Sequence, residues 1–397
     1  MKILFVCHRL PFPPKRGGKI RPFNIIRHLT ESGHSVTVGS LARSDEELAE
    51  GQPLREYCDK LFVGQINPAA AVAHMVARLP ISVPSSMGNF YSRSLHREIR
   101  EELQQTRFDL IFVHCSSVAQ YVRSAKGTPS ILDFGDMDSQ KWLDYSSFRR
   151  FPLSMGYWLE GTKLCREEKR LAGKFDLSTC TTQAELETLR SFDAARQTDW
   201  FPNGVDAEFF SPTDKPYNPD QICFIGRMDY YPNQQAMLHF CNNVLPVIQS
   251  RRPATKLIIV GAEPSGEIRN LADEPGVTVT GTVPDVRDYV RDSAISVAPL
   301  AIARGTQNKI LESMAMGVPV ICSDKAAGGV DATPGKHLLI AKSPDRYADN
   351  IIRLLENADE RRELSLASRQ RVLSAHSWPA SMTRLDGIID GLTRASS

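Results

Sequence analysis

Short apolar runs alternate with amphipathic stretches along the whole chain. In the first half, runs of strand length lie at 2–6, 35–39, 61–63, 110–113, 130–134 and 177–181. Between the first two runs, the apolar positions of residues 22–32 recur with the period of a helix, which Gly33 ends. Strands that alternate with helices are typical of parallel sheets with crossover connections. The pattern therefore predicts an α/β fold.

A break in this alternation follows residue 201. Residues 202–206 read Pro-Asn-Gly-Val-Asp, and residues 211–219 hold three prolines without any periodicity, which is typical of a linker. The alternation then begins again, with expected strands at 221–225, 257–260, 277–280, 295–298 and 318–322. A chain of 397 residues also exceeds what one hydrophobic core usually serves. We therefore expect two doubly wound, Rossmann-like domains, 1–203 and 204–377.

The last fifty residues have helical periodicity, which Pro379 interrupts. Because proline forces a kink or a new start, residues 378–397 are expected to form a separate C-terminal helix that crosses back to the first domain. The most apolar stretch of the chain is 69–83, but His74, Arg78 and Pro80 interrupt it. It is too short and too broken for a membrane span, and it predicts a helix and turn inside a domain or on its rim.

Composition and charge narrow the class of protein. Hydrophobic residues make up 42% and charged residues 24% of the chain, which is typical of a soluble globular protein. The first 200 residues carry four more basic than acidic side chains, too few for a nucleic-acid-binding surface. This excess fits an anionic membrane, a phosphate ligand or a merely solvated surface. Eight cysteines without a C-x-x-C pair, and an apolar start too short for a signal peptide, indicate a cytoplasmic protein.

Two doubly wound domains would also suit an NAD-dependent dehydrogenase. That class needs G-x-G-x-x-G directly after the first strand, and residues 8–18 lack it. A proline-rich loop ends there in Gly17 and Gly18, ahead of the first helix. Glycines at a helix start allow an anion to approach free N–H groups, but they also suit a tight turn without a ligand. The pattern excludes the dehydrogenase and leaves both interpretations open.

The second half offers a more specific anion site. The expected strand 221–225 runs into Gly226, and a second glycine-containing loop, with Gly305, Thr306 and Asn308, precedes a helix. A diphosphate at the start of that helix would meet unpaired N–H groups.

Charged side chains flank this loop. Arg227 and Lys309 would supply positive charge to a diphosphate, and they are the candidates for stabilising it as a leaving group. Glu312 lies about one turn into the helix, on the face of Asn308, and would accept hydrogen bonds from a ribose diol.

Together these motifs resemble those of the family 4 retaining glycosyltransferases (glycosyl transferases group 1), enzymes of the GT-B fold with two facing Rossmann-like domains. The resemblance covers nearly the whole chain and rests on residues 17–18, 203–206, 224–227, 281–283, 312–321 and 377–378. Residues 133–142 and 226–233 are most similar to the sugar transferases of exosortase (PEP-CTERM) systems.

The resemblance implies a UDP- or GDP-linked sugar donor, with neither a cofactor nor a metal ion. It also implies a saccharide or polyprenyl-linked acceptor, with peripheral contact at the inner face of the plasma membrane, in exopolysaccharide biosynthesis. It assigns Val283 to the donor site, and it matches His114, at the end of the expected strand 110–113, to a catalytic histidine that faces the donor sugar. Without the resemblance, His114 would equally suit a hydrogen-bonded residue at a strand end.

Two positions depart from the family pattern. Arg304 stands where many members have the first of two glutamates, and Pro232 stands where many have a lysine. We expect Lys309 or Arg304 to replace the missing positive charge. The acidic segment 133–138 suggests a metal site, but loop capping or acceptor recognition is the preferred interpretation. A nucleotide-sugar epimerase of the same fold and an inactive sugar-nucleotide-binding scaffold stay open as alternatives.

Overall fold

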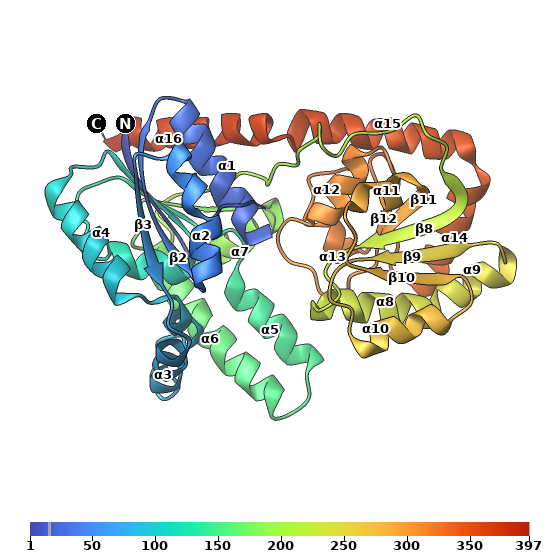
Figure 1. Ribbon diagram of the computed structural model, residues 1–397, viewed down its shortest axis with the longest axis horizontal. Coiled ribbons are helices and arrows are strands. Elements are labelled where there is room, and N and C mark those ends of the chain that lie inside the picture. The colour runs from blue at the N-terminus through green and yellow to red at the C-terminus, as the bar shows by residue number, and fades with distance from the viewer. Residues whose placement is uncertain (15–16, 397) are drawn as a thin grey trace. The chain divides into compact units, whose positions relative to one another are not determined.

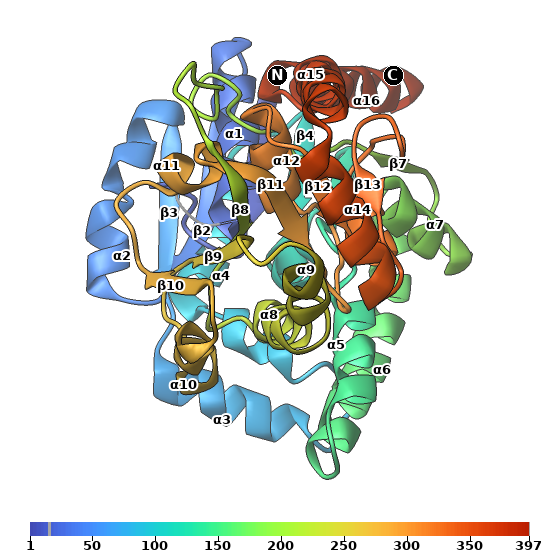
Figure 2. The ribbon, with the colours of Figure 1, turned by 90° about the vertical axis from the view of Figure 1, so that its right-hand side faces the viewer.

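The computed structural model describes residues 1–14 and 17–396 (Figure 1). Residues 15 and 16, in the proline-rich loop that precedes the paired glycines, lie outside the described residues. The chain divides into two compact units, Met1–Phe201 with Met382–Ser397, and Pro202–Ser381. Each unit is built on one parallel sheet with helices on both faces (Figures 1 and 2). The predicted α/β fold with two Rossmann-like parts is confirmed.

The first unit has seven parallel strands among its described residues, in the order β3-β2-β1-β4-β5-β6-β7. They are β1 Lys2–Cys7, β2 Ser35–Ala42, β3 Lys60–Gln65, β4 Leu110–His114, β5 Ser130–Asp133, β6 Leu177–Cys180 and β7 Thr198–Trp200. The order reverses between β1 and β4, and ligands of doubly wound sheets bind at the carboxyl ends of the strands at such a point. The sequence pattern missed β7, because three half-buried edge residues carry no periodicity.

The helices of the first unit connect these strands. They are α1 Gly17–Glu31, α2 Asp45–Glu50, α3 Pro68–Arg78, α4 Arg93–Gln105, α5 Asp138–Phe148, α6 Leu153–Ala172 and α7 Gln183–Ser191, with 3-10 turns η1 Gln52–Tyr57, η2 Ser86–Phe90 and η3 Ser116–Val122. Helix α1 begins at the paired glycines, five residues before the predicted start. Pro22 therefore lies inside it, at a cost of one intrahelical hydrogen bond.

The second unit, as far as it is described, has six parallel strands in the order β10-β9-β8-β11-β12-β13. They are β8 Asn218–Ile225, β9 Lys256–Val260, β10 Val277–Gly281, β11 Ser293–Ala298, β12 Val320–Cys322 and β13 Leu339–Ile340. Along β8, Ile222 and Phe224 pack into one apolar cluster, and Cys223 and Ile225 pack into another. Both faces of this sheet are thus buried, as parallel sheets require.

Helices of the second unit cover the two faces of its sheet (Figure 2). They are α8 Tyr231–Asn243, α9 Leu245–Arg251, α10 Gly266–Asn270, α11 Val286–Arg291, α12 Asn308–Ala315, α13 Asp324–Ala327, α14 Pro344–Glu356 and α15 Ala358–Ala375, with the 3-10 turn η4 Leu271–Asp273. In the described part of the chain, none of the helices is long and apolar enough to cross a membrane.

The C-terminal helix α16, Trp378–Ser396, follows the predicted interruption before Pro379. From Met382 onward it belongs to the first unit, where Asp386 Oδ1 lies 2.8 Å from His28 Nε2. At its start, the Trp378 ring fills the space beside Gly204, where a Cβ atom would lie 2.5 Å from the ring. This contact joins two residues that are far apart in the sequence and on which the resemblance rests in part.

Candidate functional site

Lys309 is the centre of a polar cluster in the second unit. It lies in the first turn of α12, and its Nζ donates a hydrogen bond of 2.6 Å to Asn233 Oδ1 in α8. Nζ also lies 4.4 Å from the centre of the Phe224 ring. Asn233 Nδ2 in turn donates to the carbonyl oxygen of Arg227 at 2.8 Å. The side chain of Asn233 thereby joins the lysine to the loop after β8.

Gly226 makes room for this cluster. A Cβ atom at this position would lie 2.8 Å from Asn233 Nδ2 and 3.2 Å from Lys309 Nζ. The first distance is shorter than real Cβ contacts, so any larger residue would displace the asparagine. The glycine is thus required for close packing, a reason that the sequence motif alone did not reveal.

Lys309 and Glu312 share one face of α12, three residues apart. Burial lowers the pKa of Lys309 to about 7, although the charge of Glu312 acts in the opposite direction. Burial likewise raises the pKa of Glu312 to about 7, against the charge of Lys309. Both groups therefore titrate near neutral pH, where a bound anion or hydroxyl would change their protonation.

The loop that leads into α12 offers unused hydrogen-bonding groups. Gly305 adopts a φ of 60°, in the left-handed region, and Gln307 at the N-cap gives the helix no side-chain cap. In the described part of the chain, the buried Thr306 Oγ1 and Asn308 Oδ1 have no hydrogen-bond partner. Buried polar atoms are usually paired, so these atoms and the free amides of the helix start indicate a polar ligand.

Arg227 lies at the edge of this cluster with its charge already matched. Its guanidinium binds Asp229 at 3.0 and 2.8 Å and also binds Glu263. The hydrogen bond that Arg227 donates to Asp229 raises the pKa of Arg227. Sequence reasoning missed both carboxylates, although Asp229 is only two residues from Arg227. Glu263 follows β9, and only the sheet order brings it near. Arg227 must exchange a carboxylate before it can bind a phosphate.

The other expected donor-site positions are less central. Val283, in the loop after β10, packs against the apolar cluster that includes Cys223 and Ile225. Pro232 is buried in the first turn of α8, and the cation next to this turn is Lys309, from a different helix. The backbone oxygen of Arg304 accepts a bond of 2.9 Å from Gln307 within the loop.

In the first unit, His114 and Asp133 end the neighbouring strands β4 and β5 and are paired in register. His114 Nδ1 lies 2.8 Å from Asp133 Oδ2. The same carboxylate accepts bonds from Arg21 at 2.8 and 3.0 Å and from Thr179 at 3.0 Å. Burial raises the pKa of Asp133, but the charge of Arg21 and the bonds from His114 and Arg21 outweigh it, so the pKa lies well below its usual range. Since an ionised carboxylate only accepts, Nδ1 of His114 carries a proton.

Other residues of the first unit gather around His114. The His8 ring follows β1, with its centre 5.7 Å from that of His114, and a Cβ atom at Gly18 would lie 3.8 Å from His8 Nε2. Burial lowers the pKa of His8 well below its usual value, and the charges of His114, Arg9 and Arg43 lower it further. The exposed Gly17 and Gly18, His8 and His114 thus meet where the strand order reverses, at the carboxyl ends of β1 and β4.

The backbone around His114 is also constrained. Cys115 has a φ of 81°, which is uncommon for a residue other than glycine, and its N–H donates to the Asp133 carbonyl at 2.8 Å. Gly135 has a φ of 68°, and a Cβ atom there would lie 3.5 Å from His114 Cε1. Such constraints often occur at functional sites.

Carboxylates of residues outside the acidic segment 133–138 accept hydrogen bonds from the backbone at its end. Glu185 accepts a bond of 3.0 Å from the Met137 amide, and Glu168 accepts one of 3.0 Å from the Ser139 amide. Thr181 Oγ1 donates to Asp136 at 3.1 Å. Within residues 1–14 and 17–396, no three acidic, histidine or cysteine side chains are grouped as metal ligands. The carboxylate of Asp133 pairs with Arg21, so its described partners are those of a structural ion pair.

Comparisons with known proteins agree with this architecture. The family model described as Glycosyltransferase Family 4 matches residues 16–209, and the one described as Glycosyl transferases group 1 matches residues 219–357. A 44.6 kDa protein of the cps region of Klebsiella pneumoniae is 21% identical over 400 residues, which cover 92% of this chain and 93% of that protein.

Two further proteins are similar over large parts of the chain. A GDP-mannose-dependent monoacylated α-(1-6)-phosphatidylinositol monomannoside mannosyltransferase of Corynebacterium glutamicum is 24% identical over 252 residues, 57% of this chain and 65% of that protein. The structure of HepE from Anabaena in complex with UDP has a TM-score of 0.69 and 13% identity, and covers 98% of this chain and all of that one. From the family matches, this chain belongs to the glycosyltransferases of the GT-B fold, with a family 4 part followed by a group 1 part.

Proposed function

We propose that this glycosyltransferase moves a sugar from a UDP- or GDP-linked donor to a saccharide or polyprenyl-linked saccharide, with retention of anomeric configuration and without a metal ion. The second unit binds the donor in this proposal, and the first unit binds the acceptor. The pathway is exopolysaccharide or cell-surface glycan biosynthesis at the inner face of the plasma membrane, and the resemblance favours an exosortase-associated system. The observation that carries the proposal is the start of α12, where the buried atoms Thr306 Oγ1 and Asn308 Oδ1 have no hydrogen-bond partner among the described residues and lie close to Lys309 in sequence.

In this proposal the diphosphate binds the free amides at the start of α12. Lys309 lies in the first turn of that helix, where its ammonium group would neutralise part of the charge of the diphosphate. A diphosphate would raise the pKa of Lys309 and hold it charged, which stabilises the leaving group. Arg227 contributes after it releases Asp229 or Glu263. Glu312, in its ionised form, accepts hydrogen bonds from the ribose hydroxyls.

His114 orients the donor sugar in the same proposal. Its Nδ1 is fixed by Asp133, so that Nε2 is the nitrogen left to face a substrate hydroxyl. The acceptor hydroxyl attacks from the side of the leaving group, and the departing phosphate takes its proton. No protein residue then has to act as the general base, which agrees with a histidine that is held rather than mobile.

A thermal-shift experiment tests the donor part of the proposal. UDP, GDP, ADP and their sugars are compared, because a ligand that binds only the native state raises its stability by about 2.7 kcal/mol at a hundred times its Kd. One nucleotide is expected to stabilise the protein, and a Lys309→Ala variant is expected to lose most of that shift. Failure of all nucleotides to stabilise the protein would contradict the proposal.

Measurements of donor turnover distinguish the proposed transferase from the two alternatives, an epimerase and an inactive sugar-nucleotide-binding scaffold. An epimerase converts the stabilising donor sugar without any acceptor, and an inactive scaffold binds it without converting it. The proposed transferase consumes it only when membrane extract or an oligosaccharide is added.

A further inference from the structure

Helix α3 has an unusual surface for an exposed helix. All eleven of its residues, Pro68–Arg78, are described, and only Ala71 is buried. Its single charged side chain is Arg78, at the last position. Val72 and Val76 are each 58% exposed and lie four residues apart, on one face of the helix. A helix that is apolar all round is normally covered by protein or lipid.

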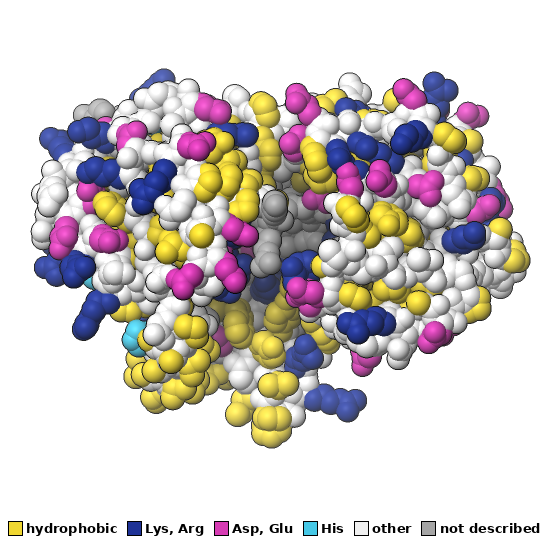
Figure 3. All heavy atoms as spheres, in the orientation of Figure 1, with side chains coloured by type: hydrophobic (Ala, Val, Ile, Leu, Met, Phe, Trp, Pro, Cys, Tyr) yellow, Lys and Arg dark blue, Asp and Glu magenta, His cyan; other side chains and the backbone are white. Residues whose placement is uncertain are grey.

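The tip of the helical pair α5 and α6 has the same character. Phe151, in the connection between them, is 76% exposed, and Trp158 in α6 is 55% exposed. We define the apolar edge as the exposed large hydrophobic residues of both places, namely Val72, Val76, Leu79, Ile81, Phe148, Phe151, Leu153, Met155, Trp158 and Leu159. Figure 3 shows hydrophobic side chains gathered over α3 and over this tip.

Helix α6 binds the end of α3 directly. Lys163 Nζ donates to the carbonyl oxygens of Arg78 and Leu79 at 3.1 and 2.8 Å. The Glu160 carboxylate accepts from the amides of Ser85 and Ser86 at 3.1 and 2.8 Å. The two parts of the apolar edge are therefore held together by hydrogen bonds within the first unit, and the edge exceeds the isolated apolar side chains that soluble proteins commonly expose.

The acidic residue that directly follows Leu159 of the apolar edge, Glu160, is buried and bound to the Ser85 and Ser86 amides. Neither residues 61–97 nor residues 145–159 contain an aspartate or a glutamate, and together they contain the five arginines Arg78, Arg93, Arg97, Arg149 and Arg150. Both parts of the edge thus combine apolar surface with positive charge alone. Such a combination attracts an anionic partner.

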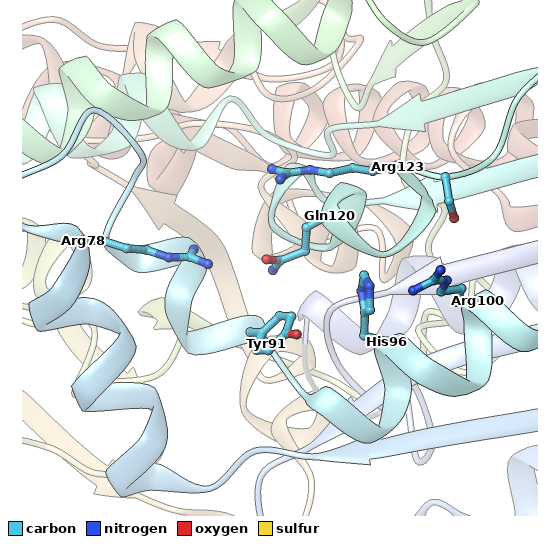
Figure 4. A pocket seen from close by; sticks show the side chains of 7 residues that line it. Arg78, Tyr91, His96, Arg100, Gln120 and Arg123 are labelled. Carbon is cyan, nitrogen blue, oxygen red and sulfur yellow. The ribbon is translucent and has the colours of Figure 1, made fainter.

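A pocket of about 450 Å³ at the end of α3 strengthens this charge pattern. Arg78, Arg100 and Arg123 line it, and none of its described lining residues is acidic (Figure 4). Burial lowers the pKa of Arg78 and the charge of Arg123 lowers it further, although the charges of Glu160 and Glu167 act in the opposite direction. In the same pocket His96 has a buried Nδ1 without a hydrogen-bond partner in the described residues. Arg123 also lies 3.7 Å from Glu167, which is not part of the pocket lining. The basic donors that converge on the pocket suit a phosphate group.

We propose that the apolar edge enters the interfacial region of an anionic lipid bilayer and that the arginine pocket receives a lipid phosphate. Tryptophan and phenylalanine with nearby arginines are the side chains that membrane interfaces favour. A second copy of the chain is the less suitable occupant, because it would bring these arginines against each other without carboxylates. The inference deepens the proposed function and rests on it only for the lipid-linked nature of the acceptor.

Vesicle binding tests the proposal. The full chain is sedimented with vesicles of phosphatidylcholine alone or of phosphatidylcholine with phosphatidylglycerol, and binding is expected only to the second kind. A Phe151→Asp/Trp158→Asp variant is expected to bind at least about tenfold more weakly, since two large apolar side chains are lost from the interface. The matched control is Leu366→Asp/Leu373→Asp, exposed leucines on α15, which is expected to bind like the wild type.

Two further measurements locate the contact. Brominated lipids are expected to quench the fluorescence of Trp158. The chain has four tryptophans, and a Trp158→Phe variant shows how much of the quenched fluorescence comes from Trp158. An Arg100→Gln/Arg123→Gln variant is expected to weaken binding to the anionic vesicles, and unchanged binding would overturn the role of the pocket.

Equal binding of the wild type to both kinds of vesicle would overturn the proposal. It would also be overturned if the aspartate variant changed the oligomeric state in light scattering while the wild type bound no vesicles, because a second copy would then cover the edge. Thermal shifts with nucleotides are recorded on the same variants. A chain that binds vesicles but no nucleotide would contradict the proposed donor site and support the membrane surface. A chain that binds a nucleotide but no vesicles would support the donor site and contradict the membrane surface.

Discussion

His114 Nδ1 and Asp133 Oδ2 lie 2.8 Å apart at the ends of two adjacent strands, and the same carboxylate binds Arg21 from α1. The Arg21 guanidinium also donates to the Phe201 carbonyl at 3.0 Å and stacks over its ring at 3.6 Å. The proposed catalytic histidine is thus fixed by a buried ion pair that ties two strands to the first helix and to the last residue before the second unit. This network makes separate predictions for stability and for turnover.

Asp133→Asn is expected to lower the free energy of unfolding at pH 7 by about 3–5 kcal/mol, because the buried charge of Arg21 would lose the carboxylate that neutralises it. The folded-state pKa of Asp133 is depressed, so the stability that it contributes is present above its unfolded pKa of about 4 and is lost as the pH falls below that value. Urea unfolding between pH 2 and 8 measures both effects. Thr179→Val removes one bond to the same carboxylate and keeps the charges, with an expected loss of about 1 kcal/mol. Equal losses in the two variants would contradict the role given to the ion pair.

His114→Ala is expected to reduce kcat about 100-fold and to leave nucleotide affinity within about twofold of the wild type, since the histidine orients the sugar and not the diphosphate. Initial rates and thermal shifts on the same preparation separate the two effects. A loss of nucleotide affinity with an unchanged kcat would be the opposite of this expectation.

Donor affinity is expected to follow a bell-shaped pH profile with its maximum near pH 7. Lys309, whose pKa lies near 7, loses its charge as the pH rises, and Glu312, also near 7, loses its charge as the pH falls. Lys309→Ala should weaken binding about 10- to 100-fold and remove the alkaline limb, and Glu312→Gln should remove the acidic limb. Titration calorimetry from pH 5.5 to 8.5 checks both variants. A flat wild-type profile, or donor affinity and turnover unchanged in Lys309→Ala, would show that these groups do not contact the donor.

Gly226→Ala is expected to weaken donor affinity about tenfold or more, because the added Cβ would displace Asn233 and with it the partner of Lys309. Gly266→Ala at the start of α10 is the matched control, since a Cβ atom there meets nothing within 4 Å. The control is expected to bind the donor normally. Equal effects of the two substitutions would argue against a positioning role for Gly226.

Sugar transfer is expected to continue in excess EDTA, because the helix start and Lys309 supply the charge that a divalent ion would otherwise provide. The rate with EDTA is compared with the rate after readdition of Mg²⁺ or Mn²⁺. Complete loss of activity in the chelator, restored by the metal, would replace this part of the proposal by a metal-dependent mechanism.

Periodicity predicted most of the strands because alternation of apolar runs is a local property of the chain. It failed at β7 and β13, where edge strands of three and two residues are too short to carry a period. It also predicts the start of α1 too late, at Pro22, although a helix can accommodate a proline with the loss of one hydrogen bond.

The site residues likewise divide into those that the sequence indicates and those whose partners only the tertiary structure reveals. Spacing alone indicated Gly226, Gly305 and Lys309, because glycine loops before helices are recognisable motifs. The pairing of Lys309 with Asn233, and of His114 with Asp133, depended on which strands and helices become neighbours. The same holds for Glu263, which reaches Arg227 from the loop after β9.

The apolar segment 69–83 shows most clearly which features the sequence by itself does not determine. The sequence identified it as the most apolar part of the chain and predicted its helix, which the structure confirms as α3. The sequence does not predict whether that helix is buried or exposed, because burial depends on what the rest of the chain packs against it. Residue order determined the helices, most strands and the glycine loops, which follow from local periodicity and spacing. Only the tertiary structure decided the partners of the charged residues and the exposed face of α3, because both arise from contacts between distant segments.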